Sequence, residues 1–238
     1  MIYKKNIELF SSYEKVSSKF KKSLNFDQDL IEKSRDIFEI NNNIAIPKKL
    51  EVIALLGGLP FSEELQESIS LIQNKLHEIL KNNLSYMVKK ENLGLELLVL
   101  KWPKDKRDYL LEKKIIEFLN TQDLSEFDLF FDGIQIHNDG CIILRGFDSD
   151  NKFISLRKII LSNFPEIPKK QSNWVHIPIG RILTQVSREV FNKLQGFVEF
   201  TQLNSDSFPT QKISTIKMIH EKQWYMEKRK TIKTWHLK

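Results

Sequence analysis

The chain has 238 residues, of which 41% are hydrophobic and 29% are charged, and its mean hydropathy is -0.35. This composition allows one large domain with a packed core, and it excludes a membrane-embedded protein because no apolar run approaches the roughly 20 residues that span a bilayer. The N-terminal residues lack the apolar stretch of a signal peptide, so we expect a cytoplasmic protein. A single cysteine, Cys141, excludes an internal disulfide and a thiolate metal site, and we expect it to be a small core residue.

The formal net charge of +6 is unevenly distributed. Residues 211–238 contain eight basic and two acidic residues, so this stretch alone carries the whole excess. A basic segment of this kind attracts phosphate groups or nucleic acid. A general bias of the sequence towards Lys, Asn and Ile is the alternative explanation.

Residues 1–50 are predicted to form a helical N-terminal extension. Residues 7–24 and 28–38 carry apolar side chains at helical spacing. Three consecutive asparagines at 41–43, followed by Pro47, then mark a break.

From residue 51 the periodicity changes and strands alternate with helices. Expected strands cover residues 51–59, 94–102, 126–138, 141–147, 173–179, 211–221 and 230–237. Expected helices cover residues 62–82, 106–120, 152–163 and 184–200. This order predicts an α+β domain over 51–238, with two pseudo-symmetric lobes that follow one another along the chain and face each other across a central cleft. Each lobe is expected to be an antiparallel sheet with helices, and the two closing strands are assigned to the second lobe.

The segment that carries chemistry is the strand at residues 173–179 and the turn after it. Strand alternation places Trp174, His176 and Pro178 on one face, and Arg181 follows at the strand end. The opposite face is apolar and consists of Val175, Ile177 and Ile179. An imidazole on a rigid strand beside a cleft is a usable acid or base near neutral pH, and an adjacent arginine can hold a phosphoryl anion.

The run His-Ile-Pro-Ile-Gly-Arg-Ile at residues 176–182 resembles the second histidine motif of the 2H phosphoesterases. This group contains RNA 2′,3′-cyclic phosphodiesterases and so-called 2′-5′ RNA ligases, and the order of elements from residue 51 onward also resembles its fold. The resemblance implies a cleft for a nucleotide or an RNA end bearing a phosphate, with His176 as the acid or base. It also implies Arg181, Trp174 and Lys101 as substrate-binding residues, with no cofactor and no metal.

The chain departs from this family pattern at both motifs. Family enzymes use two His-x-Thr/Ser strands, but Pro178 replaces the second hydroxyl here, and residues 93–102 contain neither His nor Thr. Glu96 occupies the position of the first histidine if the strand register is right, and Leu98 then replaces the hydroxyl. Three hypotheses stay open. Glu96 replaces the missing base, the cleft binds a phosphorylated ligand without cleaving it, or the fold serves another interaction such as binding RNA or a protein partner.

Aromatic residues near the C-terminus suggest a further partner. Trp224, Tyr225 and Trp235 lie among basic residues, a combination that is typical of proteins that bind single-stranded RNA. A β-hairpin with packed aromatic side chains is the alternative, and we favour it. The five histidines show no metal-ligand spacing.

Overall fold

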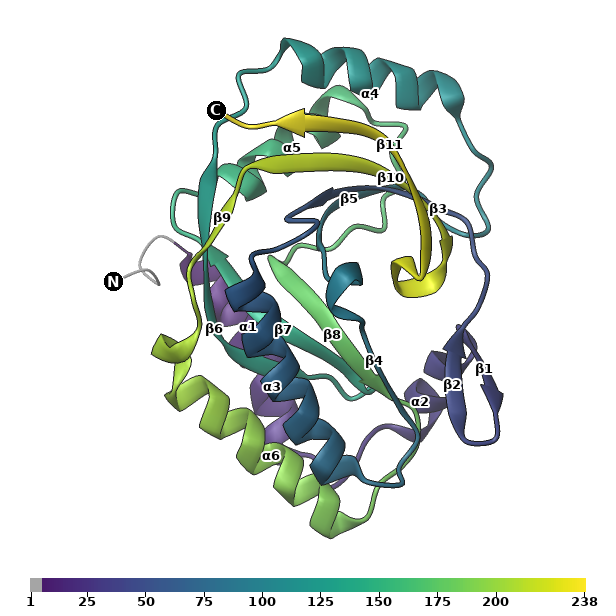
Figure 1. Ribbon diagram of the computed structural model, residues 1–238, viewed down its shortest axis with the longest axis vertical. Coiled ribbons are helices and arrows are strands. Elements are labelled where there is room, and N and C mark those ends of the chain that lie inside the picture. Colours follow the sequence, from purple (N-terminus) through teal and green to yellow (C-terminus); the bar gives the residue numbers. More distant parts are fainter. Residues whose placement is uncertain (1–5) are drawn as a thin grey trace.

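The structure is a computed structural model that describes residues 6–238 (Figure 1). Two antiparallel sheets form its centre. In the first sheet the strand order is β11 (Lys228–His236), β10 (Thr215–Gln223), β3 (Val52–Gly57) and β5 (Leu95–Lys101). In the second sheet the order is β4 (Ser85–Met87), β8 (His176–Ile182), β7 (Cys141–Asp148), β6 (Phe127–Ile136) and β9 (Gln211–Ile213). The predicted α+β class with two antiparallel sheets is confirmed.

Helices cover the outer side of each sheet (Figure 1). Helices α4 (Tyr109–Thr121) and α5 (Lys152–Asn163) lie over the first sheet, and α3 (Glu63–Leu80) and α6 (Arg188–Leu203) lie over the second. Three of these helices begin where the sequence provides a side-chain cap, because Ser62, Asp108 and Ser187 each accept a hydrogen bond from a backbone N–H of the first turn. Short 3₁₀ turns occur at η2 (Lys90–Asn92), η3 (Ser205–Ser207) and η4 (Trp224–Met226).

The two lobes do not follow one another along the chain, and this corrects the sequence-based assignment. The closing strands β10 and β11 belong to the first sheet, where β10 pairs with β3 from Ile216 opposite Gly57 to Glu221 opposite Val52. Helix α3 follows β3 in sequence but covers the second sheet (Figure 1). Local periodicity identifies a strand but not its partner, so the order of elements alone could not assign them to lobes.

The N-terminal extension contains more than helices. Helices α1 (Ile7–Lys22) and α2 (Gln28–Arg35) are followed by a hairpin of β1 (Phe38–Asn41) and β2 (Ile44–Pro47). The asparagines that mark a break in the sequence form its two-residue turn, with positive φ at both Asn42 and Asn43. The extension therefore adds a small two-stranded sheet to the fold.

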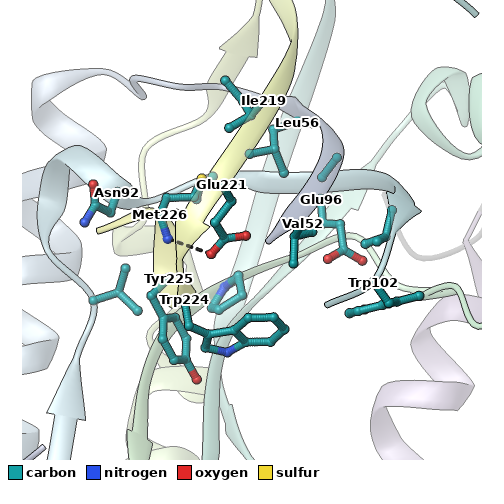
Figure 2. Close-up of a pocket in the computed structure, with 15 residues that line it drawn as sticks. Val52, Leu56, Asn92, Glu96, Trp102, Ile219, Glu221, Trp224, Tyr225 and Met226 are labelled. Carbon is teal, nitrogen blue, oxygen red and sulfur yellow. Dashed lines mark hydrogen bonds between the residues drawn. The ribbon is translucent and has the colours of Figure 1, made fainter. Parts of the chain in front are cut away.

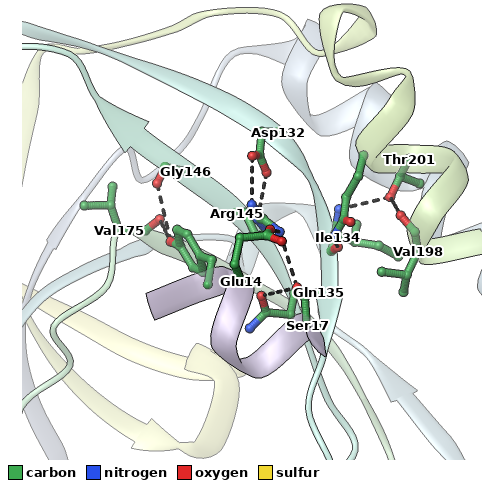
Figure 3. A network of polar contacts seen from close by, with 12 residues as sticks. Glu14, Ser17, Asp132, Ile134, Gln135, Arg145, Gly146, Val175, Val198 and Thr201 are labelled. Carbon is green, nitrogen blue, oxygen red and sulfur yellow. Dashed lines mark hydrogen bonds and ion pairs between the residues drawn. The ribbon is translucent and has the colours of Figure 1, made fainter. Parts of the chain in front are cut away.

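Helix α1 covers one face of the second sheet. Its Tyr13 hydroxyl donates to the Val175 carbonyl at 2.5 Å, and its Ser17 hydroxyl donates to Gln135 Oε1 of β6 at 3.0 Å. Arg145, which lies directly opposite His176 in the β7–β8 pairing, binds Glu14 of α1 at 3.0 Å (Figure 3). Directly opposed residues share a sheet face, so α1 lies on the face that carries His176. We call this surface the covered face.

No helix within residues 6–238 is long and apolar enough to cross a membrane.

Candidate functional site

His176 lies at the start of β8, on the covered face. Its Nδ1 atom is buried and has no hydrogen-bond partner within residues 6–238, and its ring lies edge-on to Trp174 at 6.1 Å between centroids. Burial, followed by the neighbouring His137 and Arg157, lowers the pKa of His176 to about 3. The imidazole is therefore neutral at physiological pH and is not poised to gain a proton there. The apolar face of the same strand is packed in the core as predicted, since Val175, Ile177 and Ile179 are all buried.

Two further predicted site residues are committed to contacts inside the protein. Arg181 donates from Nε to the Tyr225 hydroxyl at 2.9 Å and from Nη1 to Ser34 Oγ at 2.6 Å and Asp139 Oδ2 at 3.0 Å. Trp174 donates from Nε1 to Ser12 Oγ of α1 at 2.7 Å. Arg181 thus connects β8 to the N-terminal extension and to η4, and Trp174 anchors α1.

The amino group of Lys101 is also bound inside the protein, by backbone carbonyls. Lys101 is 5% exposed, and its Nζ donates to the Glu51 carbonyl at 2.9 Å and the Trp102 carbonyl at 3.2 Å. A salt bridge of 3.7 Å to the Glu51 carboxylate completes its surroundings. These contacts fix the end of β5 and leave Lys101 outside the pocket described below.

A buried arginine that the sequence analysis missed lies between the two motif strands. Arg157 of α5 is 4% exposed and donates from Nε to the Leu97 carbonyl at 2.8 Å. Its Nη2 donates to the carbonyls of Glu96 at 2.9 Å and Trp174 at 3.0 Å. It therefore ties β5 to the residues that enter β8. Its position within a helix of apolar periodicity gave no sign of this role.

The cleft side of the first sheet forms a small pocket, which we call the acidic pocket (Figure 2). Glu96 reaches it from β5, as the alternation with buried Leu95 and Leu97 predicts, and Pro178 of β8 lines its opposite side. Its volume is about 160 Å³. The remaining walls are Val52, Ala54, Leu56, Val88, Asn92, Gly94, Val99, Trp102, Ile219, Glu221, Trp224, Tyr225 and Met226. Glu221 is a site residue without a motif of its own, and only its strand alternation with Ile219, which places both on one face of β10, points to it.

The two carboxyl groups of the acidic pocket are both shifted towards the protonated form. Burial raises the pKa of Glu96, against the charge of Arg157. Burial likewise raises the pKa of Glu221 to about 7, and the charge of Glu96 adds to this increase while a hydrogen bond from the Met226 backbone opposes it. The pocket therefore holds two neighbouring acids in a largely apolar enclosure.

Neither metal ligands nor phosphate-binding residues gather in this pocket. Within the described residues no group of three or more His, Cys, Asp or Glu side chains is arranged to hold a metal ion. The residues lining the pocket include no Lys, Arg or His. His176 is not among the lining residues, so the pocket brings Glu96 together with Pro178 rather than with the imidazole.

Comparison with known proteins identifies the fold. No protein-family model and no curated protein matches the sequence. Among solved structures, Escherichia coli LigT in apo form aligns with a TM-score of 0.56 at 14% identity, covering 80% of this chain and 99% of that one. LigT has also been solved with phosphate, ATP and 3′-AMP.

Two further structures give the same result. The Agrobacterium tumefaciens protein ATU0111, of unknown function, aligns with a TM-score of 0.59 at 11% identity, covering 87% of this chain and 98% of that one. TT0787 of Thermus thermophilus aligns with a TM-score of 0.54 at 12% identity, covering 78% and 97%. These alignments confirm, at the level of the fold, the resemblance that the motif around His176 predicts. The chain has the fold of the 2H phosphoesterases.

Proposed function

We propose that this chain is a catalytically inactive member of the 2H phosphoesterase fold that acts by binding a ligand in the acidic pocket. The observation that carries this proposal is the state of His176. An acid or base catalyst must exchange a proton near the working pH, so a pKa of about 3 leaves this imidazole without that capacity. Helix α1 also lies across the sheet face that carries the ring.

The charges of the cleft support binding without hydrolysis. A phosphodiesterase stabilises the negative charge of its transition state with donors or cations aimed at the phosphate. Here the guanidinium of Arg181 and the amino group of Lys101 are bound by internal acceptors. The open pocket instead presents the carboxyl groups of Glu96 and Glu221 and, among the described residues, no cation, so it offers a phosphate no positive partner.

The test is an assay of 2′,3′-cyclic nucleotides with the wild type, His176→Ala, His176→Gln and Glu96→Gln. We expect all four proteins to turn over substrate at the same background rate. Hydrolysis by the wild type that His176→Gln lowers by a hundredfold or more would restore the rival assignment, in which His176 is the acid or base and Glu96 its partner. Circular dichroism of each variant separates lost activity from lost folding.

RNA binding through β11 is a second candidate, because this edge strand exposes Lys228, Arg229 and Lys230. Of the two nearby acids, Glu221 is half-buried and lines the acidic pocket, and Glu227 is bound by Lys89 at 2.6 Å and Tyr86 at 2.6 Å. Lysines on an edge strand also prevent edge-to-edge pairing, which is the simpler explanation. Labelled single-stranded RNA should bind with a steep salt dependence that Lys228→Glu/Lys230→Glu reduces. Binding that is unchanged in this double variant would remove β11 from any RNA site.

A further inference from the structure

The walls of the acidic pocket combine aromatic rings with carboxyl groups (Figure 2). Trp102 lines it from the end of β5, and Trp224 and Tyr225 line it from η4. Two of these rings are fixed by hydrogen bonds: Trp102 Nε1 donates to the Lys170 carbonyl at 3.1 Å, and the Tyr225 hydroxyl accepts from Arg181; the Trp224 ring lies edge-on to Tyr225, with 6.4 Å between centroids. These rings therefore present preformed faces.

The carboxylate of half-buried Glu96 enters this enclosure without a hydrogen-bond partner within residues 6–238. Glu221 accepts one hydrogen bond, from the Met226 backbone N–H at 2.8 Å. The charge of Glu96 adds to the raised pKa of Glu221, and two ionised acids in an apolar pocket are costly for the fold unless a cation or a proton neutralises them. The pocket thus directs two carboxyl groups at its interior.

The protein's own cations near these acids are bound elsewhere. The guanidinium of Arg157 is taken up by the carbonyls of β5 and Trp174. Arg229 binds the side chain of Asn92 and the carbonyls of Glu91 at 2.8 Å and Met226 at 3.0 Å. Lys170 lies over the ring of Trp102, with its Nζ 5.1 Å from the centroid, and it does not line the pocket. These cations act on the two acids from outside the pocket, and no Lys, Arg or His side chain of the described residues lines it, so a cation that enters the pocket can make a direct contact that the chain itself does not supply.

The volume restricts what can supply this charge. A cavity of about 160 Å³ is about half the lower limit of the roughly 300–1,000 Å³ that ligand pockets usually occupy, so a nucleotide does not fit inside it. The floor is apolar, with Val52, Ala54, Leu56, Val99 and Ile219 side by side. A short alkyl chain with a cationic head matches both the size and this floor.

We propose that the acidic pocket binds an alkylammonium group that carries at least one N–H, with its cationic head between Glu96, Glu221 and the indole rings of Trp102 and Trp224. This inference rests on the proposed binding function and names its ligand class. Aromatic faces attract ammonium ions through their quadrupole, and the carboxylates require N–H donors that a quaternary ammonium lacks. The head group belongs either to a free amine or to a lysine side chain of another protein.

The experiment titrates the full chain with n-butylammonium and follows the fluorescence of the pocket tryptophans and the heat of binding. We expect n-butanol, the neutral analogue, and butyltrimethylammonium, which lacks an N–H, to bind at least tenfold more weakly. The variants Glu96→Gln and Glu221→Gln should each weaken binding of n-butylammonium at least tenfold. Glu67→Gln, which removes an exposed carboxylate of α3, is the matched control and should bind like the wild type.

A second measurement reports on the same two acids. An ammonium ion favours their ionised forms, so binding at pH 7 should release protons, seen as a heat that varies with the ionisation enthalpy of the buffer. The double variant Glu96→Gln/Glu221→Gln should release none. A comparison with Nα-acetyl-lysine methylamide identifies the source: at least tenfold tighter binding than n-butylammonium indicates a lysine side chain, and equal or weaker binding indicates a free amine.

Equal affinity for n-butylammonium and n-butanol, or unchanged affinity in both Glu→Gln variants, would overturn the inference. No saturable binding of either ammonium probe to a wild type that is folded by circular dichroism would do the same. These results are independent of the cyclic nucleotide assay: hydrolysis dependent on His176 would contradict the proposed inactivity alone, and absent amine binding would contradict the inference alone.

Discussion

The covered face of the second sheet and the acidic pocket of the first sheet belong to the same cleft but differ in how their charged side chains are paired. On the covered face, buried Arg145 is neutralised within the chain by Asp132 and by Glu14 of α1 (Figure 3). In the acidic pocket, Glu96 and Glu221 face each other's charge without a cation lining the same space. One half of the cleft is thus completed by the N-terminal extension, whereas the other is left with unmatched charge. This difference is the basis for assigning stability to the covered face and, as we propose, ligand binding to the pocket.

The largest loss of stability is expected when the ion pairs of Arg145 on the covered face are removed. Arg145 is 1% exposed, and its Nε lies 2.7 Å from Asp132 Oδ1, so Arg145→Met leaves a buried carboxylate without its partner. We predict a loss of about 3–5 kcal/mol in the free energy of unfolding, measured by urea denaturation. Lys75→Met, which breaks the exposed pair with Glu78, should change this energy by less than about 0.5 kcal/mol. Similar losses in both variants would show that the face is not held by this network.

In the acidic pocket we expect a substitution to raise the free energy of unfolding rather than to lower it. The folded-state pKa of Glu221, about 7, lies above the unfolded value, so the folded protein loses stability as the pH rises between about 4.5 and 7. Glu221→Gln removes this loss and should raise the free energy of unfolding by about 2–3 kcal/mol at pH 8, and by almost nothing at pH 4. Because the same variant should bind alkylammonium more weakly, stability and binding would move in opposite directions. A variant less stable than the wild type at pH 8 would contradict the idea of unmatched charge.

A third prediction concerns the imidazole of the covered face. Since the pKa of His176 is depressed to about 3, its neutral form is favoured in the folded state, and the associated stability is fully present above pH 6.5 and is lost as the pH falls. We compare the free energy of unfolding of the wild type with that of His176→Gln at pH 8 and at pH 4. Between these two pH values the wild type should lose about 2 kcal/mol more than the variant. Imidazole NMR signals of His176 that titrate near pH 6 would show that the ring is accessible to water.

The smallest effect is expected where α1 meets the strand that bears His176. Tyr13→Phe removes the hydroxyl that donates to the Val175 carbonyl, while the Gly146 N–H still donates to the same oxygen at 2.8 Å. The loss should be about 1 kcal/mol in the free energy of unfolding. Increased exchange of the Val175 and Gly146 amides with solvent would locate the loosening at this contact, and exchange limited to α4 would argue against it.

The sequence by itself determined the local elements and the polarity of the motif strands. Strand alternation predicted that Val175, Ile177 and Ile179 are buried, because a period of two is a property of the strand alone, but it left open the register that directs Glu96 to the pocket. The caps of α3, α4 and α6 are local as well, because Ser62, Asp108 and Ser187 each bond to the first turn of their own helix. The three-residue strand β4 was missed because so short a segment shows no period.

Only the tertiary structure decided the state of the site. The surroundings of His176 depend on α1, which is more than 150 residues away along the chain and binds the neighbouring Trp174 and Val175. Whether Arg181 meets a ligand depends on Tyr225 and Ser34, and whether Glu221 joins Glu96 depends on β10 pairing with β3. Burial and pKa are set by what packs against a group from distant segments, and such packing leaves no periodic mark in the local sequence.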